Sequence, residues 1–213
     1  SGRGLVMGHY ARGSNRVIQV DECPVHSPRG NRIAFALRDE LAKARIPAAG
    51  TNLAGIVRHV LIRTTADDRE AVAMLVVTRN DKALRRPVRA LLASAEKPDG
   101  FFINIHDEPG PYMVGRETLK IEGHAQIRER VGGLSFLVSP TAFFQTNVRA
   151  ASALQQYVLT ALAVSPATAA TASVATAPPV SPSRSINTPP RVLDLYCGSG
   201  LFSLTLAQAG ARV

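Results

Sequence analysis

Cysteine is scarce in this sequence, and its scarcity limits the classes of protein that fit. The 213 residues contain 2 cysteines, Cys23 and Cys197. A disulfide-stabilised secreted scaffold needs several cysteines, so this class is excluded and we expect a cytoplasmic protein. Long apolar runs are also missing, because no uninterrupted run approaches the roughly 20 residues that span a membrane. We therefore expect no membrane partner.

The sequence also lacks an initiating methionine and any internal repeat. It begins Ser1-Gly2-Arg3 and stops at Val213. Both ends resemble cuts in a longer protein, so the absence of a signal peptide is weak evidence. The hydrophobic fraction of 46% is ordinary for a globular protein. We expect a monomer.

Acidic side chains are too few to balance the basic ones. The sequence has 25 Lys and Arg against 16 Asp and Glu, a net charge of +9. Residues 1–100 carry 17 basic and 10 acidic side chains, whereas residues 101–150 carry 5 of each. The densest basic segment contains Arg79, Lys82, Arg85, Arg86 and Arg89. Such a charge favours a polyanion, with nucleic acid as the first candidate, and a solvated arginine-rich surface is the alternative.

Apolar periodicity predicts an α/β chain. Strands are expected at 5–10, 15–20, 55–64, 71–78, 101–105, 117–123 and 134–138, the last two flanking a turn at 132–133. Helices are expected over 27–45, after Pro87, and over 147–162. The apolar stripe of the last helix should consist of Leu154, Val158 and Leu162.

The segment 164–190 differs in composition from the rest of the chain. Ala, Thr, Ser and Pro dominate it, and Arg184 is its only charged residue. Such a composition cannot bury a core, so we expect a flexible tether between ordered parts or an insertion in one domain.

The last stretch, 191–213, is the most informative. An apolar strand, a turn containing Gly198 and Gly200, and the start of a helix follow one another. Glycine lets the backbone approach a ligand closely, and open α/β sheets bind ligands at the carboxyl ends of their strands. The segment therefore predicts the beginning of a nucleotide-type cofactor domain. A glycine turn alone is shared by many such folds.

Three motifs in this order resemble the RNA uracil-C5 methyltransferases. They are MGHYARGSNRVIQVDECPV at 7–25, GLSFLVSPTAFFQTN at 133–147 and DLYCGSGLF at 194–202. The resemblance implies a central α/β RNA-binding domain with antiparallel strands at 1–140. An entry segment and helix at 141–163 and the truncated start of a Rossmann-like class I methyltransferase domain at 191–213 follow. It also implies S-adenosylmethionine as cofactor.

The resemblance assigns cofactor contacts to five residues: Gln145, Asp194, Tyr196, Gly198 and Gly200. Gln145 matches the glutamine of the family's Phe-x-Gln-x-Asn motif, although an ordinary polar residue at a helix entry is the alternative. Tyr196 could instead pack in the core, and Asp194 could only organise the turn by accepting N–H bonds. Leu201 departs from relatives that carry Asn or Thr. Cys197 is interpreted as a small buried turn residue.

Cys23 precedes a proline, as does one cluster ligand in family members that modify 23S rRNA. The resemblance thus implies that Cys23 is a metal ligand, one of four cysteines around a 4Fe-4S cluster in the full-length protein. It favours 23S rRNA over tRNA as the partner. A lone buried cysteine is the alternative.

The resemblance also implies a mechanism. A cysteine thiolate adds to C6 of a flipped-out uridine, C5 then takes the methyl group, and a base removes the C5 proton. In relatives the cysteine lies in a Ser-Cys-Asn-Pro segment, which this sequence lacks. We therefore name no catalytic residue and expect the chain alone to be inactive and to bind S-adenosylmethionine weakly or not at all. A non-catalytic RNA-binding remnant, and a methyltransferase for another substrate such as tRNA, stay open as alternatives.

Overall fold

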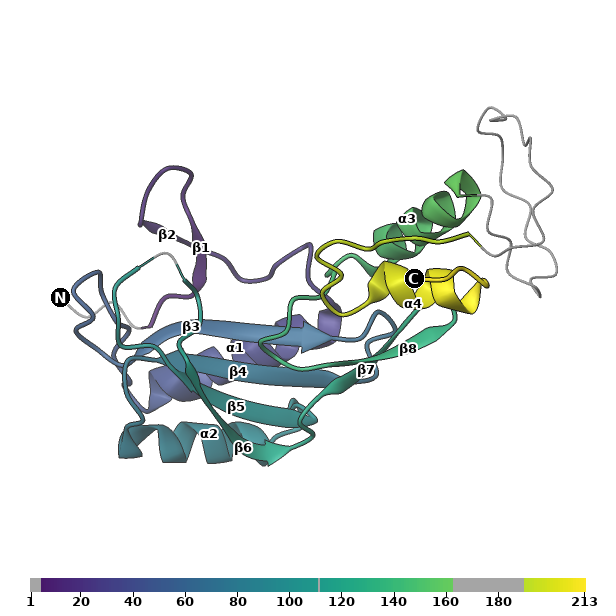
Figure 1. The fold of residues 1–213 in the computed structure, drawn as a ribbon. Coiled ribbons are helices and arrows are strands. Elements are labelled where there is room, and N and C mark those ends of the chain that lie inside the picture. Colours follow the sequence, from purple (N-terminus) through teal and green to yellow (C-terminus); the bar gives the residue numbers. More distant parts are fainter. Residues whose placement is uncertain (1–4, 111, 163–189) are drawn as a thin grey trace. The chain divides into compact units, whose positions relative to one another are not determined.

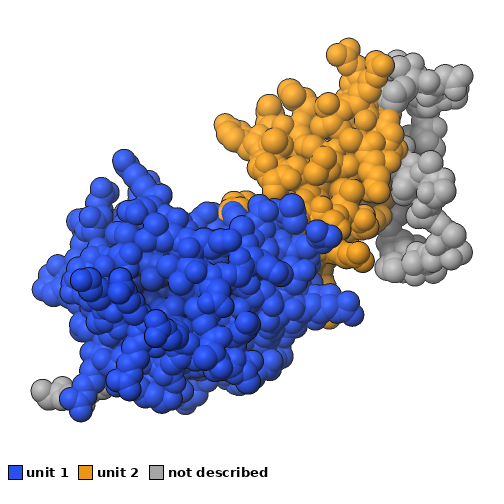
Figure 2. Space-filling view, turned by 90° about the horizontal axis from the view of Figure 1, so that it is seen from below, with its two compact units in different colours: residues 1–129, 137–141 blue, residues 130–136, 142–213 orange. Residues whose placement is uncertain are grey.

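The computed structural model describes residues 5–110, 112–162 and 190–213. The predicted tether at 164–190 lies outside the described residues except for Pro190. The chain divides into two compact units, residues 1–129 with 137–141 and residues 130–136 with 142–213 (Figure 2). The domain boundaries predicted from the sequence stay a prediction.

The first unit is built on a four-stranded sheet in the order β3-β4-β5-β6 (Figure 1). The strands are β3 (Val57–Thr64), β4 (Ala71–Val77), β5 (Gly100–Ile105) and β6 (Glu117–Gly123). β3 pairs antiparallel with β4, β4 parallel with β5, and β5 antiparallel with β6. The predicted α/β class is confirmed. The sheet is mixed, because a helix crossover connects β4 to β5 and brings them parallel.

Two helices, α1 (Pro28–Lys43) and α2 (Arg85–Leu92), cover one face of this sheet (Figure 1). Ile33, Leu37 and Leu41 of α1 follow the helical repeat and are fully buried. They pack into a core with alternate residues of β4 and β5 and with Val88 and Leu91 of α2. β4 is a continuous apolar run that is buried along its whole length, as expected for a central strand.

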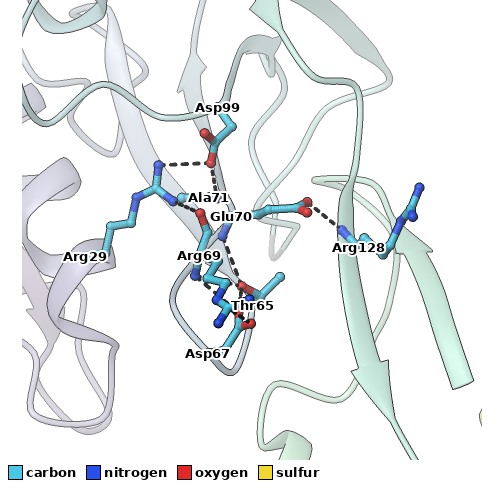
Figure 3. A network of polar contacts seen from close by, with 8 residues as sticks. All are labelled: Arg29, Thr65, Asp67, Arg69, Glu70, Ala71, Asp99 and Arg128. Atoms are coloured by element: carbon cyan, nitrogen blue, oxygen red, sulfur yellow. Dashed lines mark hydrogen bonds and ion pairs between the residues drawn. The ribbon is translucent and has the colours of Figure 1, made fainter. Parts of the chain in front are cut away.

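The start of α1 is tied to the sheet by a polar network (Figure 3). Arg29 pairs with Asp99 at 3.0 Å, and the same Asp99 carboxylate accepts the Ala71 N–H at 2.7 Å. Glu70 accepts the N–H of Arg128 at 2.8 Å. The turn between β3 and β4 is therefore joined to α1, to the entry of β5 and to a later strand, which fixes the position of the helix.

The remaining strands form two short β-hairpins. β1 (Gly8–Tyr10) pairs antiparallel with β2 (Val17–Gln19), as predicted. β7 (Ile127–Val131) and β8 (Leu134–Val138) form the other two-stranded sheet. The sequence-based prediction missed β7 because its IRERV pattern alternates with charged residues, which resembles a loop. The turn at 132–133 thus joins β7 to β8 and not β6 to β8.

The second unit contains α3 (Val148–Ala161) and α4 (Leu201–Gln208). Asn147 caps α3 as predicted, since its side chain accepts the Ala150 N–H at 3.0 Å. The predicted stripe is wrong: Ala151, Gln155 and Leu159 are buried, whereas Leu154 and Leu162 are exposed. Helix α3 is rotated relative to the prediction because Leu159 packs with Leu206 and Ala211.

A full strand at the start of 191–213 is not observed. Only an isolated parallel bridge forms, between Arg191 and Arg212. A strand needs neighbours to pair its backbone groups, and none lies beside 193–195 in the described residues, so Leu193 stays 81% exposed. The parallel bridge with α4 between its two sides is nevertheless the connectivity of a β-α-β unit.

Candidate functional site

The glycine turn before α4 has an unusual backbone. Tyr196, Gly198 and Gly200 have φ values of 61°, 55° and 77°, whereas Cys197 and Ser199 between them do not have positive φ. Left-handed residues at alternate positions bend the backbone sharply, and turns that contain them are a setting in which backbone N–H groups can bind anions. Gly200 N–H donates to the Cys197 carbonyl, but no hydrogen bond between described residues uses the N–H of Gly198 or Ser199.

Asp194 supports this turn from the side of α4. Its half-buried carboxylate accepts a hydrogen bond from the Ser203 hydroxyl in the first turn of the helix. Asp194 therefore organises the turn through the Ser203 hydroxyl. The sequence analysis had considered backbone N–H groups as its partners instead. Tyr196 is 103% exposed, so its side chain does not pack in a core formed by the described residues. Its left-handed backbone costs about 1–2 kcal/mol for a non-glycine residue.

Gln155 was missed by the sequence analysis. Its side chain is 1% exposed, and its Nε2 donates to the Leu201 carbonyl at 2.9 Å and to Thr205 Oγ1 at 2.7 Å. Thr205 also donates to the Leu201 carbonyl, so this carbonyl is an acceptor and fixes the orientation of the amide. Gln155 therefore ties α3 to the beginning of α4. A polar residue within an apolar helical stripe is the sequence signal that could have revealed it.

Gln145 is exposed on the segment that enters α3. Its neighbour Phe144 is buried and packs against Phe136 with ring centroids 5.4 Å apart, which anchors the segment. Among the described residues no hydrogen bond joins Gln145 to the glycine turn. The five predicted cofactor contacts stay predictions; the side chain of Gln145 is accessible, and both glycines have positive φ.

Cys23 is half-buried and free. The side chain of Asn31 in α1 holds its peptide from both sides: Oδ1 accepts the Cys23 N–H at 2.8 Å, and Nδ2 donates to the Cys23 carbonyl at 3.0 Å. In the part of the chain that the structure describes, no group of three or more His, Cys, Asp or Glu side chains could hold a metal. A 4Fe-4S cluster takes four cysteine thiolates, so Cys23 alone does not define a cluster site.

Cys197 is exposed, so its interpretation as a buried turn residue is wrong. No other described residues cover the turn that contains Cys197, and its side chain faces solvent. As Cys23 and Cys197 are both free, the structure contains no disulfide between them.

The basic segment forms a surface on the first unit. Lys82, Arg85, Arg86 and Arg89 line a hollow of about 740 Å³, to which Ala44, the residue that caps the end of α1, also contributes. Arg79 does not belong to it, because it pairs with Asp81 at 3.3 Å and donates to the Gly55 carbonyl. A hydrogen bond from the Ala83 N–H, together with Arg79, lowers the pKa of Asp81, so its carboxylate stays charged. This carboxylate already binds Ala83 and Arg79 and does not pair with the cations of the hollow.

Among the described helices, none is long and apolar enough to cross a membrane. The fold defines the class of the chain: a mixed α/β unit is followed by a segment with β-α-β connectivity. No protein-family model matches the chain. Relatives with similar sequences do exist.

An uncharacterized RNA methyltransferase of Fusobacterium nucleatum is 29% identical over 153 residues, which are 70% of this chain and 33% of the relative. One of Geobacter sulfurreducens is 26% identical over 213 residues, 98% of this chain and 38% of the relative. The chain thus spans little more than a third of the length of these curated relatives.

The crystal structure of Pyrococcus abyssi tRNA (uracil-54, C5)-methyltransferase in complex with S-adenosyl-L-homocysteine has the same fold. The TM-score is 0.71 at 21% identity, over 96% of this chain and 43% of that protein. The names of the relatives agree with the resemblance to RNA methyltransferases that the three motifs carry, and the structural neighbour shares the fold.

Proposed function

We propose that this chain is part of an S-adenosylmethionine-dependent methyltransferase that modifies C5 of a uridine in RNA, with 23S rRNA as substrate. The observation that carries the proposal is the glycine turn, with positive φ at Tyr196, Gly198 and Gly200, between the two sides of a parallel bridge. Related RNA methyltransferases in the sequence comparison and the uracil-C5 methyltransferase fold of the structural neighbour support it.

The residues of the turn fit S-adenosylmethionine, which supplies an activated methyl group when bound. The N–H groups of Gly198 and Ser199 suit its carboxylate, because they are unused by the described residues and lie in a turn with left-handed residues at alternate positions. Gly198 and Gly200 permit close approach of the ligand, and Tyr196 offers an exposed aromatic face. Gln145 offers both a donor and an acceptor. Asp194 is a positioning residue that holds the turn through Ser203.

The catalytic cysteine belongs to a Ser-Cys-Asn-Pro segment that the 213 residues do not contain. We therefore propose that the chain alone transfers no methyl group. We also propose that the whole protein is a cytoplasmic monomer, as the sequence analysis expects. Cys23 precedes Pro24 as in members that modify rRNA, which supports 23S rRNA as the substrate. The residues present supply one of the four ligands of an iron–sulfur cluster, so no step is assigned to such a cluster.

The test is a tritium-release assay with unmodified transcripts labelled at C5 of uridine. Methylation at C5 expels the tritium, so release reports this position and no other. The complete protein encoded by the gene is expected to release tritium from 23S rRNA fragments and to form a covalent adduct with RNA containing 5-fluorouridine. The 213-residue chain is expected to do neither.

Each other outcome has a defined meaning. Tritium release from tRNA alone would mean that the substrate is tRNA and not 23S rRNA, with the same reaction. Methylation without tritium release would refute uracil C5 as the target. Binding of RNA without any methylation by the complete protein would favour the non-catalytic remnant.

A further inference from the structure

The hollow on α2 has a simple composition. Four of its lining residues are cations and the other four are alanines: Lys82, Arg85, Arg86, Arg89, Ala44, Ala83, Ala90 and Ala93. The inner face of the helix is apolar, since Pro87, Val88 and Leu91 are buried. The four cations are all exposed, and the other lining residues have side chains of a single methyl group, which leaves the space of the hollow open.

The four cations have no acidic partner among the described residues. Ion pairs do occur elsewhere in this unit, for example Arg32 with Glu96 at 3.0 Å. The one carboxylate close in sequence, Asp81, is engaged by Arg79 and by the Ala83 N–H. The hollow is thus a concentration of uncompensated positive charge.

The position of these cations does not help the helix. Arg85 and Arg86 occupy the first turn of α2, and this turn contains no acidic residue. The amino end of a helix carries partial positive charge, so cations there are unfavourable and an anion is favourable. The 3-10 turn Lys82–Leu84 leads directly into α2 and is capped by Asp81, which Arg79 engages, so a bound anion would be the partner that Arg85 and Arg86 lack among the described residues.

The chemistry of the lining also indicates which part of a nucleic acid it contacts. Single-stranded RNA is recognised by aromatic side chains that stack on bases, and base edges are read by amides and other polar groups. This lining contains neither aromatic nor amide side chains. Without an aromatic or amide group beside them, the lysine and arginines are best suited to phosphates, which double-helical RNA presents while its bases are hidden in the stack.

We propose that this hollow docks the sugar–phosphate backbone of a double-helical stem in the RNA on which the protein acts. The inference rests on the proposed function only in taking RNA as the partner. It places an anchor on the first unit that is separate from the glycine turn and independent of base sequence.

The experiment measures binding of a fluorescent RNA hairpin with a 20-base-pair stem by the 213-residue chain, using anisotropy between 50 and 200 mM salt. A single-stranded oligouridine of equal charge is the second probe. Each phosphate contact contributes about 0.9 to the slope of log affinity against log salt on a duplex. The variant Arg85→Ala/Arg86→Ala/Arg89→Ala is therefore expected to flatten the slope by about 3 and to lose at least about tenfold in affinity for the hairpin.

The matched control is Arg16→Ala/Lys97→Ala/Arg116→Ala. It removes the same charge from three exposed positions of the first unit that do not line the hollow. It should keep the affinity and slope of the unchanged chain within about twofold. A second variant, Arg85→Lys/Arg86→Lys/Arg89→Lys, retains the charge and should retain binding. Circular dichroism should show the same helix content in all variants, because alanine and lysine are both good helix formers.

Three results would overturn the inference. Equal losses in the alanine variant and its control would reduce the effect to net charge. A greater loss of affinity for oligouridine than for the hairpin would assign the hollow to single-stranded RNA. If the unchanged chain did not bind the hairpin at all, a double-helical stem would be refuted as the ligand. A failure of tritium release with hairpin binding intact would contradict the proposed function and leave this inference standing.

Discussion

Replacing Gly132 with alanine tests the contact between the β7–β8 turn and Gln155. A Cβ at Gly132 would lie 2.4 Å from Gln155 Oε1, which is buried and has no hydrogen-bond partner in the described part of the chain. Gln155 cannot move freely, since its Nε2 donates to Leu201 and Thr205. Gly133→Ala is the matched control, because its φ is also positive, at 82°, but nothing lies within 4 Å of its Cβ.

The magnitudes follow from these two positions. Both variants place an alanine in a left-handed conformation, at a cost of about 1 kcal/mol. Gly132→Ala in addition displaces the Gln155 amide and breaks two hydrogen bonds of about 1 kcal/mol each. The difference of about 2 kcal/mol corresponds to an opening equilibrium about 25-fold larger for Gly132→Ala.

Hydrogen exchange of peptides from α3 and α4 is the suitable assay. It reports the opening of these helices without requiring the two units to unfold together. Exchange in α4 should be about 25-fold faster in Gly132→Ala than in Gly133→Ala, and this difference should vanish when Gln155→Ala is added to both. Equal exchange in the two single variants would refute the role of Gln155 as the link between the turn and α4.

Two further perturbations address the first unit. Burial, and to a lesser extent Arg58 and His106, lowers the pKa of His59 below 6.5, so the unfolded chain binds more protons and stability should fall as pH drops below about 6.5. Urea unfolding at pH 5.5 and 7.5 should show a smaller pH effect in His59→Gln, and an unchanged effect would contradict this role. Asn104 is fully buried and exchanges hydrogen bonds with Gly115 in both directions, so Asn104→Ala should destabilise the unit by about 3 kcal/mol and speed proteolysis within 106–116. Thr118→Val, which loses only the bond from Asn104 Nδ2 to Thr118 Oγ1, should cost about 1 kcal/mol, and equal costs for the two variants would argue against the network.

The first unit could be predicted largely from sequence because its signals are local. Ser27 before Pro28 marks the start of α1, and the apolar run of β4 marks a central strand. β7 could not be predicted because Glu129 and Arg130 interrupt its apolar pattern, although Glu129 is buried and accepts the Ala66 N–H. The partner that makes a charged residue tolerable in a strand lies 63 positions away, beyond the reach of local patterns.

The candidate site was predictable in part. The glycines at 198 and 200 were expected to form a turn, and both adopt a conformation that favours glycine. The buried amide of Gln155 and the clamp on Cys23 were not foreseen, because each depends on contacts between distant elements. The stripe of α3 was misplaced since leucines at 154 and 162 also fit a helical repeat, and only packing against α4 selects the face that is buried.

The grip of Asn31 on both sides of the Cys23 peptide has a thermodynamic consequence. Because one side chain of α1 holds the backbone that carries the thiol, the sulfur keeps its place only while that helix is folded. Anything that bonds to the sulfur in this arrangement, and not in the unfolded chain, must stabilise α1 by its binding free energy. The converse also holds: destabilising α1 weakens such a bond. Binding at the thiol and folding of the helix are therefore thermodynamically linked.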